Sequence, residues 1–315
     1  MDTGEQLTGE RLMPQDQHGE LVHAEHLTRY LLAAQLAPGR RVLDIACGEG
    51  YGTAMLDEAG ATGAVGVDVD EPTVAAARER YSCDFRCADI ATLPFEDASF
   101  DLVVSFETIE HVADAEAALS ELARVLAPEG LLVISTPNKH EYLVDNEFHT
   151  REFSHEEFAA LLSRRFDDVR LLYQHNWLMS AILEEEALRE ASGSHAIEAD
   201  VRKTVGREPG RELYTLALCG KQTAVPVRQV AVAAGTDEAH ALAQRLVECE
   251  QTVRKWHDEY KKAEDTAQLW HDTYKEQEQR TEEAWGHVHR MQESLSWRIT
   301  KPLRIPAKLR ERRGR

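Results

Sequence analysis

The sequence predicts an α/β protein with a doubly wound, seven-stranded sheet, followed by a long C-terminal coiled-coil helix. Two observations predict this class. Short aliphatic or β-branched runs alternate with longer stretches of helical periodicity over residues 1 to about 222. From Glu238 onward the composition shifts to Glu, Lys, Gln, Ala and Arg with no proline before Pro302, which indicates one long helix.

The seven predicted strands are all short and rich in Val, Leu, Ile, Phe or Cys. The segments between them are amphipathic, as in Glu116–Leu126, where leucines recur at helical spacing. This alternation is typical of repeated βα units and a largely parallel sheet. In chain order the strands are Arg41–Ile45, Ala64–Val69, Asp84–Cys87, Asp101–Ser105, Leu131–Ser135, Val169–Tyr173 and Leu213–Cys219.

The chain divides into four predicted regions. Residues 1–222 form the α/β domain, and residues 223–236, which are small, β-leaning and without charge pattern, form a linker. Residues 237–297 form the coiled coil, and residues 298–315 form a basic tail.

The phrase Trp-His-Asp-x-Tyr-Lys occurs twice in the helical region, beginning at Trp256 and at Trp270. Both copies fall on an a/d seam, because apolar or small residues follow one another at alternating intervals of four and three. His257 and His271 lie off the seam and would be roughly 20 Å apart along one helix, too far to share a metal ion. The seam positions are Leu242, Leu246, Cys249, Val253, Trp256, Tyr260, Ala263, Ala267, Trp270, Tyr274, Gln277, Thr281, Ala284, Val288, Met291 and Leu295.

The net charge of −20 is unevenly distributed. Residues 298–315 hold eight Lys or Arg and one acid, Glu311. The rest of the chain is therefore even more acidic than the whole. Such a negative charge repels a phosphate backbone, which argues against nucleic acid as a partner. The basic tail predicts docking on an anionic membrane surface or on a partner protein, with a solubilising tail or an RNA-binding end as the alternative.

Targeting and cysteine patterns predict a cytoplasmic protein, peripheral at the inner face of the membrane if the tail docks there. The N-terminus has neither a basic region nor an apolar core of the signal-peptide kind, and no apolar run reaches membrane-spanning length. Five scattered cysteines predict reduced thiols rather than a disulfide framework.

The most informative segment is Arg41-Val-Leu-Asp-Ile-Ala-Cys-Gly-Glu-Gly-Tyr-Gly52, a strand that enters a glycine-rich turn and then a helix. Glycines there let a ligand approach the backbone, and the helix N-terminus supplies free N–H donors. Asp68 ends the second strand, where a carboxylate can bind both hydroxyls of a ribose. Cys87-Ala-Asp-Ile90 and Ser99-Phe-Asp-Leu-Val-Val-Ser-Phe-Glu-Thr-Ile-Glu-His-Val112 follow in order.

Together these motifs resemble the class I S-adenosylmethionine-dependent methyltransferases over roughly residues 7 to 220. The resemblance implies a seven-stranded, Rossmann-like sheet whose last strand is antiparallel, with S-adenosylmethionine as cofactor at the carboxyl ends of the strands. The alternative is a nicotinamide enzyme, but its Gly-x-Gly-x-x-Gly spacing differs from that of Gly48, Gly50 and Gly52.

The resemblance also implies roles for individual residues. Asp44 and the turn from Ala46 through Gly48 to Gly50 would hold the methionine portion of the cofactor, and Asp68 its ribose. Ala46 departs from the family pattern, which most often has its first glycine there. The remaining implied contacts are Asp89 and Ile90 with the adenine, and Phe106 and Glu107 with the sulfonium and the acceptor.

Transfer to a hydroxyl also requires that a proton be removed, and histidine is the natural base. His111 lies four residues after Glu107, one helical turn further if that segment is helical, and is the first candidate for the base. Its alternative role is to anchor the segment after the fourth strand. His149 is the second candidate, near Glu152, which in turn could instead cap the helix that begins at Ser154.

No metal ligands are predicted. His23 and His26 lie three residues apart on an apparent helix without an obvious carboxylate cluster, so packing is favoured over metal binding. Metal independence is therefore the expectation.

A narrower resemblance rests on four phrases: Thr8-Gly-Glu-Arg-Leu-Met-Pro14, Glu25-His-Leu-Thr-Arg-Tyr30, Ser135-Thr-Pro-Asn-Lys139 and Phe148-His-Thr-Arg-Glu-Phe153. They are similar to methyltransferases associated with bacterial O-antigen and other surface-polysaccharide assembly. Some of those also carry a kinase, whose signature is absent here.

This narrower resemblance implies methylation of a sugar hydroxyl, or of an amine, on a glycan or nucleotide-sugar acceptor, by a chain that self-associates through its coiled coil. The alternatives are a small-molecule or natural-product methyltransferase, and a coiled-coil scaffold that binds the cofactor without turnover.

Overall fold

The computed structural model describes residues 20–141, 148–177, 179–182, 184–185, 201–233, 237–295 and 299. The chain divides into two compact units, Met1–Glu238 and Ala239–Arg315. The phrase Thr8–Pro14 and nearly all of the predicted basic tail lie outside the described residues.

The first unit contains one seven-stranded sheet in the order β3-β2-β1-β4-β5-β7-β6. Six strands run parallel, and β7 pairs antiparallel with both β5 and β6, so the antiparallel last strand is confirmed. Every predicted strand is present, although β5 begins five residues earlier than predicted, at Leu126. The strands are β1 (Arg41–Ile45), β2 (Gly63–Asp68), β3 (Asp84–Cys87), β4 (Phe100–Ser105), β5 (Leu126–Pro137), β6 (Asp168–Gln174) and β7 (Tyr214–Gly220).

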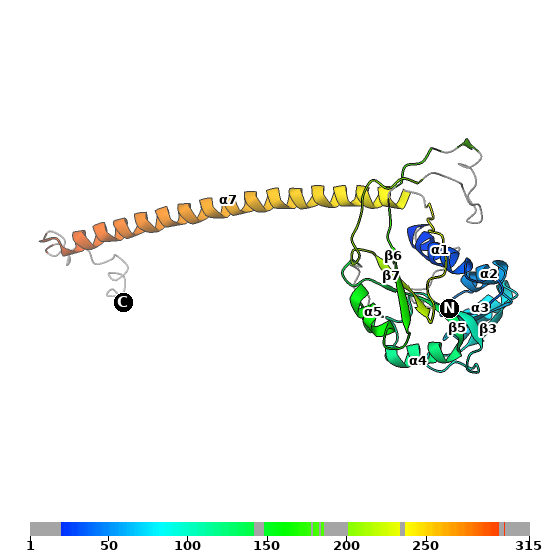
Figure 1. The fold of residues 1–315 in the computed structure, drawn as a ribbon. Helices are drawn as coiled ribbons and strands as arrows, with labels where there is room; N and C mark the ends of the chain where they lie inside the picture. Colours follow the sequence, from blue (N-terminus) through cyan, green and yellow to red (C-terminus); the bar gives the residue numbers. More distant parts are fainter. Residues whose placement is uncertain are drawn as a thin grey trace, which may run out of the picture. The chain divides into compact units, whose positions relative to one another are not determined.

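Alternation along the strands divides the core between the two faces of the sheet. Leu43 and Ile45 face one side, where they pack with α4 (Ala115–Val125) and α5 (His155–Leu162). Val42 faces the other, with α1 (Glu20–Ala34) and α2 (Tyr51–Glu58). The helices thus cover both faces, as Figure 1 shows, and α3 (Glu71–Arg80) packs near β2 and β3. The fold is doubly wound because successive residues of a strand point to opposite faces.

The strand order places a crevice in the middle of the sheet. From β1 the chain proceeds outward through β2 to β3, and then returns to β4 on the other side of β1. The connections after β1 and β4 therefore diverge at their carboxyl ends, which is where open α/β sheets bind ligands.

The first residues of the predicted linker pack on the α/β domain. Thr223 is buried, and its N–H and hydroxyl both donate to Asp168 Oδ2, over 2.9 and 2.8 Å. Further along, Arg228 N–H donates to Gln35 Oε1 of α1 over 2.8 Å. Residues 223–233 lie in the first unit, whose boundary with the second lies at Glu238.

The second unit is dominated by one helix, α7 (Asp237–Glu293), drawn in yellow to orange in Figure 1. Its 57 residues give it a length of about 85 Å at the usual rise per residue. The aromatic seam residues are exposed, at 73% for Trp256 and 71% for Trp270. The predicted long helix is confirmed, whereas the coiled coil stays a prediction.

Two further sequence expectations concern thiols and membrane spans. All five cysteines are free thiols, as predicted. Within the described residues, no helix is both long and apolar enough to cross a membrane.

Candidate active site

The loop between β1 and α2 has an unusual backbone conformation and leaves open space over one of its glycines. Ala46, Gly48 and Gly50 all have left-handed backbones, with φ of 56°, 53° and 87°. A Cβ added to Gly48 would meet nothing within 4 Å, whereas one on Gly50 would lie 2.7 Å from the Phe85 ring. Gly48 therefore leaves room for a ligand, and Gly50 is required for packing under the loop.

Asp44 lies beneath this loop and is fully buried. Its carboxylate accepts hydrogen bonds from the Thr53 hydroxyl, over 2.7 Å, and from the Tyr30 hydroxyl, over 3.2 Å. Burial raises the pKa of Asp44 to about 7, against the two hydrogen bonds, which lower it. The structure thus places Asp44 where it ties the loop to α1 and α2.

Asp68 ends β2 and faces the same loop. Its Oδ2 accepts from the Gly48 N–H and its Oδ1 from the Asp70 N–H, each over 3.0 Å. Asp70 has a different task, because its side chain caps α3 by accepting from the Thr73 N–H. The hydrogen bond between Gly48 and Asp68 thus joins the glycine-rich loop to the end of β2.

The end of β3 lies next to the end of β2. Ala88 N–H donates to the Asp68 carbonyl over 3.0 Å, and Asp89 begins a turn by accepting from the Ala91 N–H. Ile90 is half-buried, and Val69 exposes 66% of its surface. An exposed valine beside these groups supplies an apolar contact for a flat ring.

Phe106 and Glu107 follow β4, on the other side of the crevice. The Phe106 ring packs edge-on against Tyr30, with centroids 5.2 Å apart. Glu107 has a left-handed backbone, and its carboxylate accepts from the Ser135 hydroxyl of β5 over 2.5 Å. Burial raises the pKa of Glu107, while the nearby Arg29 guanidinium opposes the rise.

His111 lies on a turn, so the possibility of a helical segment after β4 was wrong. The His111 N–H donates to the Thr108 carbonyl over 3.0 Å, which closes a turn that contains Glu110. Glu110 is 1% exposed. Burial, and then the Glu107 carboxylate, raise the pKa of Glu110 well above its usual range.

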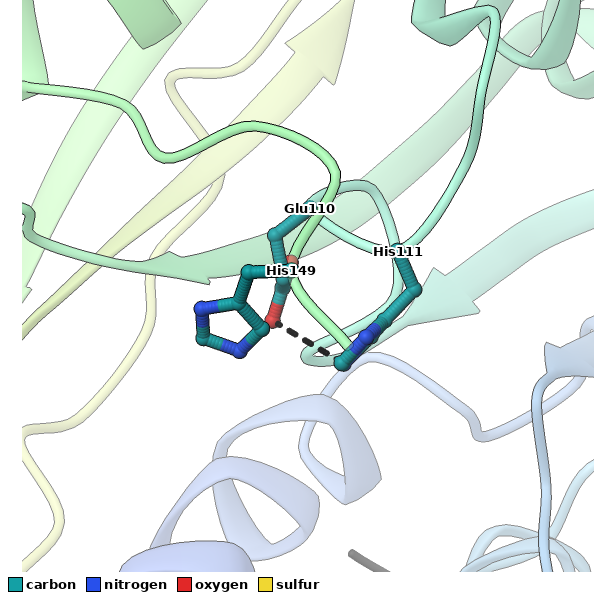
Figure 2. Close-up of side chains that lie close together, drawn as sticks. All are labelled: Glu110, His111 and His149. Atoms are coloured by element: carbon teal, nitrogen blue, oxygen red, sulfur yellow. Dashed lines mark ion pairs between the residues drawn. The ribbon is translucent and has the colours of Figure 1, made fainter. Parts of the chain in front are cut away.

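His149 reaches the same place from a distant segment. Thr150 N–H donates to the Glu110 carbonyl over 2.8 Å, and the rings of His111 and His149 lie 4.9 Å apart. Figure 2 shows Glu110, His111 and His149 gathered at one point. The structure therefore brings both predicted catalytic histidines together with an acid that sequence reasoning did not single out.

Glu152 does not cap the following helix. The capping box of α5 is formed by Ser154 and Glu157, which exchange hydrogen bonds between side chain and backbone. Glu152 instead accepts from His149 Nδ1 over 3.2 Å. Its position three residues after His149 suits this contact, so Glu152 belongs to the histidine cluster.

The paired histidines of α1 pack rather than join the cluster. His26 is half-buried, and burial lowers its pKa well below the usual range. The His23 ring lies 6.1 Å from that of Tyr51.

Sequence reasoning missed two other groups near the crevice. Arg29 of α1 is 1% exposed, lies over the Tyr214 ring and donates to Gln174 over 2.9 Å. Ser135 of β5 is fully buried and donates to the Glu107 carboxylate. Arg29 lies within the quoted phrase Glu25–Tyr30, where a basic residue on an otherwise apolar helical face was the available signal.

Comparison with known proteins decides the family. A family model described as a methyltransferase domain matches residues 43–134. A protein of Mycolicibacterium smegmatis named as a probable S-adenosylmethionine-dependent methyltransferase is 36% identical over 215 residues, which is 65% of this chain and 80% of the relative. The chain belongs to the S-adenosylmethionine-dependent methyltransferases.

Two other relatives of this methyltransferase agree. One from Mycobacterium tuberculosis, also named as a probable S-adenosylmethionine-dependent methyltransferase, is 35% identical over 64% of this chain and 74% of the relative. An O-methyltransferase of Penicillium expansum is 34% identical over 39% of this chain and 47% of the relative.

The cofactor of this methyltransferase is therefore S-adenosylmethionine, which supplies an electrophilic methyl group when bound. The residues present fit such a molecule, since Gly48, which has open space over it, is bonded to Asp68, and the next residue, Val69, is exposed. Gly48 would contact its methionine portion, Asp68 its ribose and Val69 its adenine.

Proposed function

We propose that this methyltransferase methylates a hydroxyl group of a sugar, or an amine, during the assembly of a surface glycan. One observation carries the proposal: carboxylates and imidazoles cluster after β4, next to the end of β5. The contributing residues are Glu107, Glu110, His111 and His149, and Ser135 connects the first of them to β5.

Such a cluster suits a polar acceptor. Carboxylates and imidazoles accept hydrogen bonds from hydroxyl groups, and burial of Glu107 and Glu110 strengthens those bonds. A lipophilic acceptor would leave buried acids unsatisfied, at a cost of about 1–3 kcal/mol for each group.

Transfer to a hydroxyl requires removal of its proton, and His111 is the proposed base. Its ring is partly exposed and its Nδ1 contacts the Phe148 carbonyl over 3.2 Å, which directs Nε2 toward the cluster. His149 is the second candidate for the base, and Glu107 helps to place the acceptor. The proposed cofactor site consists of Asp44, the loop from Ala46 to Gly50, Asp68, Asp89, Ile90 and Phe106.

Turnover with labelled S-adenosylmethionine tests the acceptor class. We expect transfer to nucleotide sugars or to lipid-linked glycan extracted from cells. Transfer to a lipophilic phenol alone would make the protein a small-molecule methyltransferase. Cofactor binding with no transfer to any of these acceptors would favour the alternative of a scaffold that acts on glycan assembly without turnover.

We further propose that α7 self-associates as a coiled coil. An isolated helix whose seam exposes Trp256, Tyr260, Trp270 and Tyr274 leaves a long apolar stripe in water, and a second such helix would cover it. The basic tail would then dock on an anionic membrane surface or on a partner in glycan assembly.

A further inference from the structure

Three side chains from two separate segments meet after β4. Glu110 and His111 lie on the turn that follows β4, and His149 lies on the segment before α5. The carboxylate and the two imidazoles each offer one ligand atom, and these atoms all lie within 4.8 Å of one another. Figure 2 shows the carboxylate of Glu110 between the two rings.

Glu110 is the buried member. Its Oε2 accepts from the Thr136 hydroxyl over 3.2 Å, but its Oε1 has no hydrogen-bond donor within the described part of the chain. That oxygen lies 3.9 Å from His111 Nε2. The desolvation of this buried oxygen is not compensated by a hydrogen bond, so the arrangement points to a missing positive group.

Both histidines are oriented as metal ligands usually are. His111 Nδ1 contacts the Phe148 carbonyl, and His149 Nδ1 contacts the Glu152 carboxylate, each over 3.2 Å. Both of these oxygens are acceptors, so the contacts favour the tautomer that carries its proton on Nδ1, in which Nε2 is the nitrogen that can bind a metal ion. Ligating histidines commonly donate their other N–H to a carbonyl or a carboxylate, which sets the tautomer.

The surrounding charge also favours a cation. Two acidic residues, Glu107 and Glu110, follow β4 within three residues of each other, and Glu110 is 1% exposed. The buried Arg29 guanidinium donates to Gln174 and lies over the Tyr214 ring. A second positive charge would relieve the repulsion between the carboxylates.

We propose that Glu110, His111 and His149 bind one divalent first-row transition-metal ion. Two imidazoles and one carboxylate form the ligand set that holds such ions while leaving other coordination positions open. Nitrogen ligands favour a transition metal over Mg²⁺ or Ca²⁺, which prefer oxygen.

The cluster needs only a small adjustment to bind an ion. At metal–ligand distances of about 2.1 Å, neighbouring ligand atoms lie about 3.0–3.4 Å apart. The atoms here lie up to 4.8 Å apart, so rotation of the partly exposed His111 ring inward would close the site.

The role of the ion deepens the proposed function and rests on it. Open positions on the ion would bind hydroxyl oxygens of the acceptor, orient them and lower the pKa of the hydroxyl to be methylated. His111 and His149 then hold the ion instead of taking the proton. In that case the metal independence expected from the sequence does not hold.

The test is direct metal binding by the full-length protein. Chelator-treated protein is titrated with Mn²⁺ and with Co²⁺ by calorimetry, and the Co²⁺ complex is also followed by its visible absorption. We expect one ion per chain. Glu110→Gln and His149→Ala should each weaken binding at least tenfold, and Glu152→Ala, which removes the partner of His149, should weaken it about tenfold.

His140→Ala is the matched control, because it removes an exposed histidine outside the cluster. It should bind the ion as the unchanged protein does. Retained S-adenosylmethionine affinity shows that each variant is folded. Glu110→Gln is the decisive variant if His149→Ala fails to fold, since it removes a buried charge and keeps the shape of the side chain.

Three results separate this inference from the proposed function. No stoichiometric binding, or equal binding by Glu110→Gln and the unchanged protein, would overturn the metal site. Full transfer to sugars by ion-free protein would overturn the role of the ion in binding the acceptor and leave the proposed function in place. Stoichiometric binding that these variants weaken, without transfer to any sugar, would support the site and refute the sugar acceptor.

Discussion

The backbone N–H of Gly48 donates a hydrogen bond to Oδ2 of Asp68 over 3.0 Å, which joins the loop after β1 to the end of β2. The carboxylate that is predicted to bind the ribose therefore also holds the loop that is predicted to contact the methionine portion. We expect Asp68→Ala to weaken S-adenosylmethionine binding at least tenfold in calorimetry, because one change removes both the ribose acceptor and the loop contact.

Asp70→Ala is the control for this variant. Its side chain caps α3, so this substitution should lower the free energy of unfolding by about 1 kcal/mol and leave the cofactor affinity within twofold. Equal losses of affinity in the two variants would contradict the assignment of Asp68.

Ala46 occupies a backbone conformation that favours glycine, with φ of 56°. A non-glycine residue in this region costs roughly 1–2 kcal/mol; glycine removes that strain, but its larger loss of entropy on folding offsets part of the gain. We expect Ala46→Gly to raise the free energy of unfolding by up to about 1 kcal/mol in urea denaturation. Cofactor affinity should stay equal or increase, because the loop keeps its shape.

Ala98 offers a matched comparison, since it also has a left-handed backbone, with φ of 58°, and its N–H donates to the Arg124 carbonyl. Ala98→Gly should give a similar gain in stability with no change in cofactor affinity. A loss of stability in Ala46→Gly alone would show that the loop has another conformation.

The raised pKa of Asp44 predicts how stability depends on pH. Its pKa is about 7 in the folded protein and 3.8 in its ordinary state, so the folded protein binds the proton more tightly. The contribution of this group to the free energy of unfolding is therefore greatest below pH 3.8, falls as the pH rises toward 7, and is constant above that. The total change is at most about 4 kcal/mol.

Asp44→Asn should flatten this part of the pH profile in urea denaturation at pH 5 and pH 8, because asparagine stays neutral. Asp101→Asn serves as the comparison. Hydrogen bonding to Arg41 lowers the pKa of Asp101, so removing this carboxylate should leave the decline in the free energy of unfolding between pH 5 and 7 in place. An unchanged profile in Asp44→Asn would mean that this carboxyl is ionised in the folded protein throughout.

Self-association through α7 depends on seam residues in the predicted coiled coil. Trp256→Glu places a charge on the seam, where it would be buried between helices, so light scattering should show a smaller assembly. His257→Glu places the same charge one position away, off the seam, and should leave the assembly size unchanged. If the unchanged protein is a monomer, the coiled-coil prediction is wrong.

Much of the fold was accessible from local patterns. All seven strands, the antiparallel last strand and the long C-terminal helix follow from residue alternation, turn residues or family resemblance, and the structure confirms them. The start of β5 was missed because Leu126 also continues the helical pattern of α4. In the structure the backbone changes from helical to extended at Leu126, which pairs with Phe100 of β4.

The cofactor loop and the acid after β2 could be located from sequence because each follows a strand at short range. The Glu110 cluster could not, because His149 is brought to it by a parallel bridge between Asn138 and Phe153 and by the bond from Thr150 to the Glu110 carbonyl. Such long-range contacts leave no periodic signal in the sequence.

The sequence by itself determined the sheet, the order of its motifs, the long helix and the family, since each depends on local alternation, spacing or identity. Only the tertiary structure decided that Glu110 is buried, with one oxygen that meets no donor among the described residues, and that residues 108–111 form a turn. It also decided that Glu152 contacts His149 while Glu157 caps α5. The physical reason is that burial and side-chain convergence arise from packing between distant segments, and no local pattern of residues specifies them.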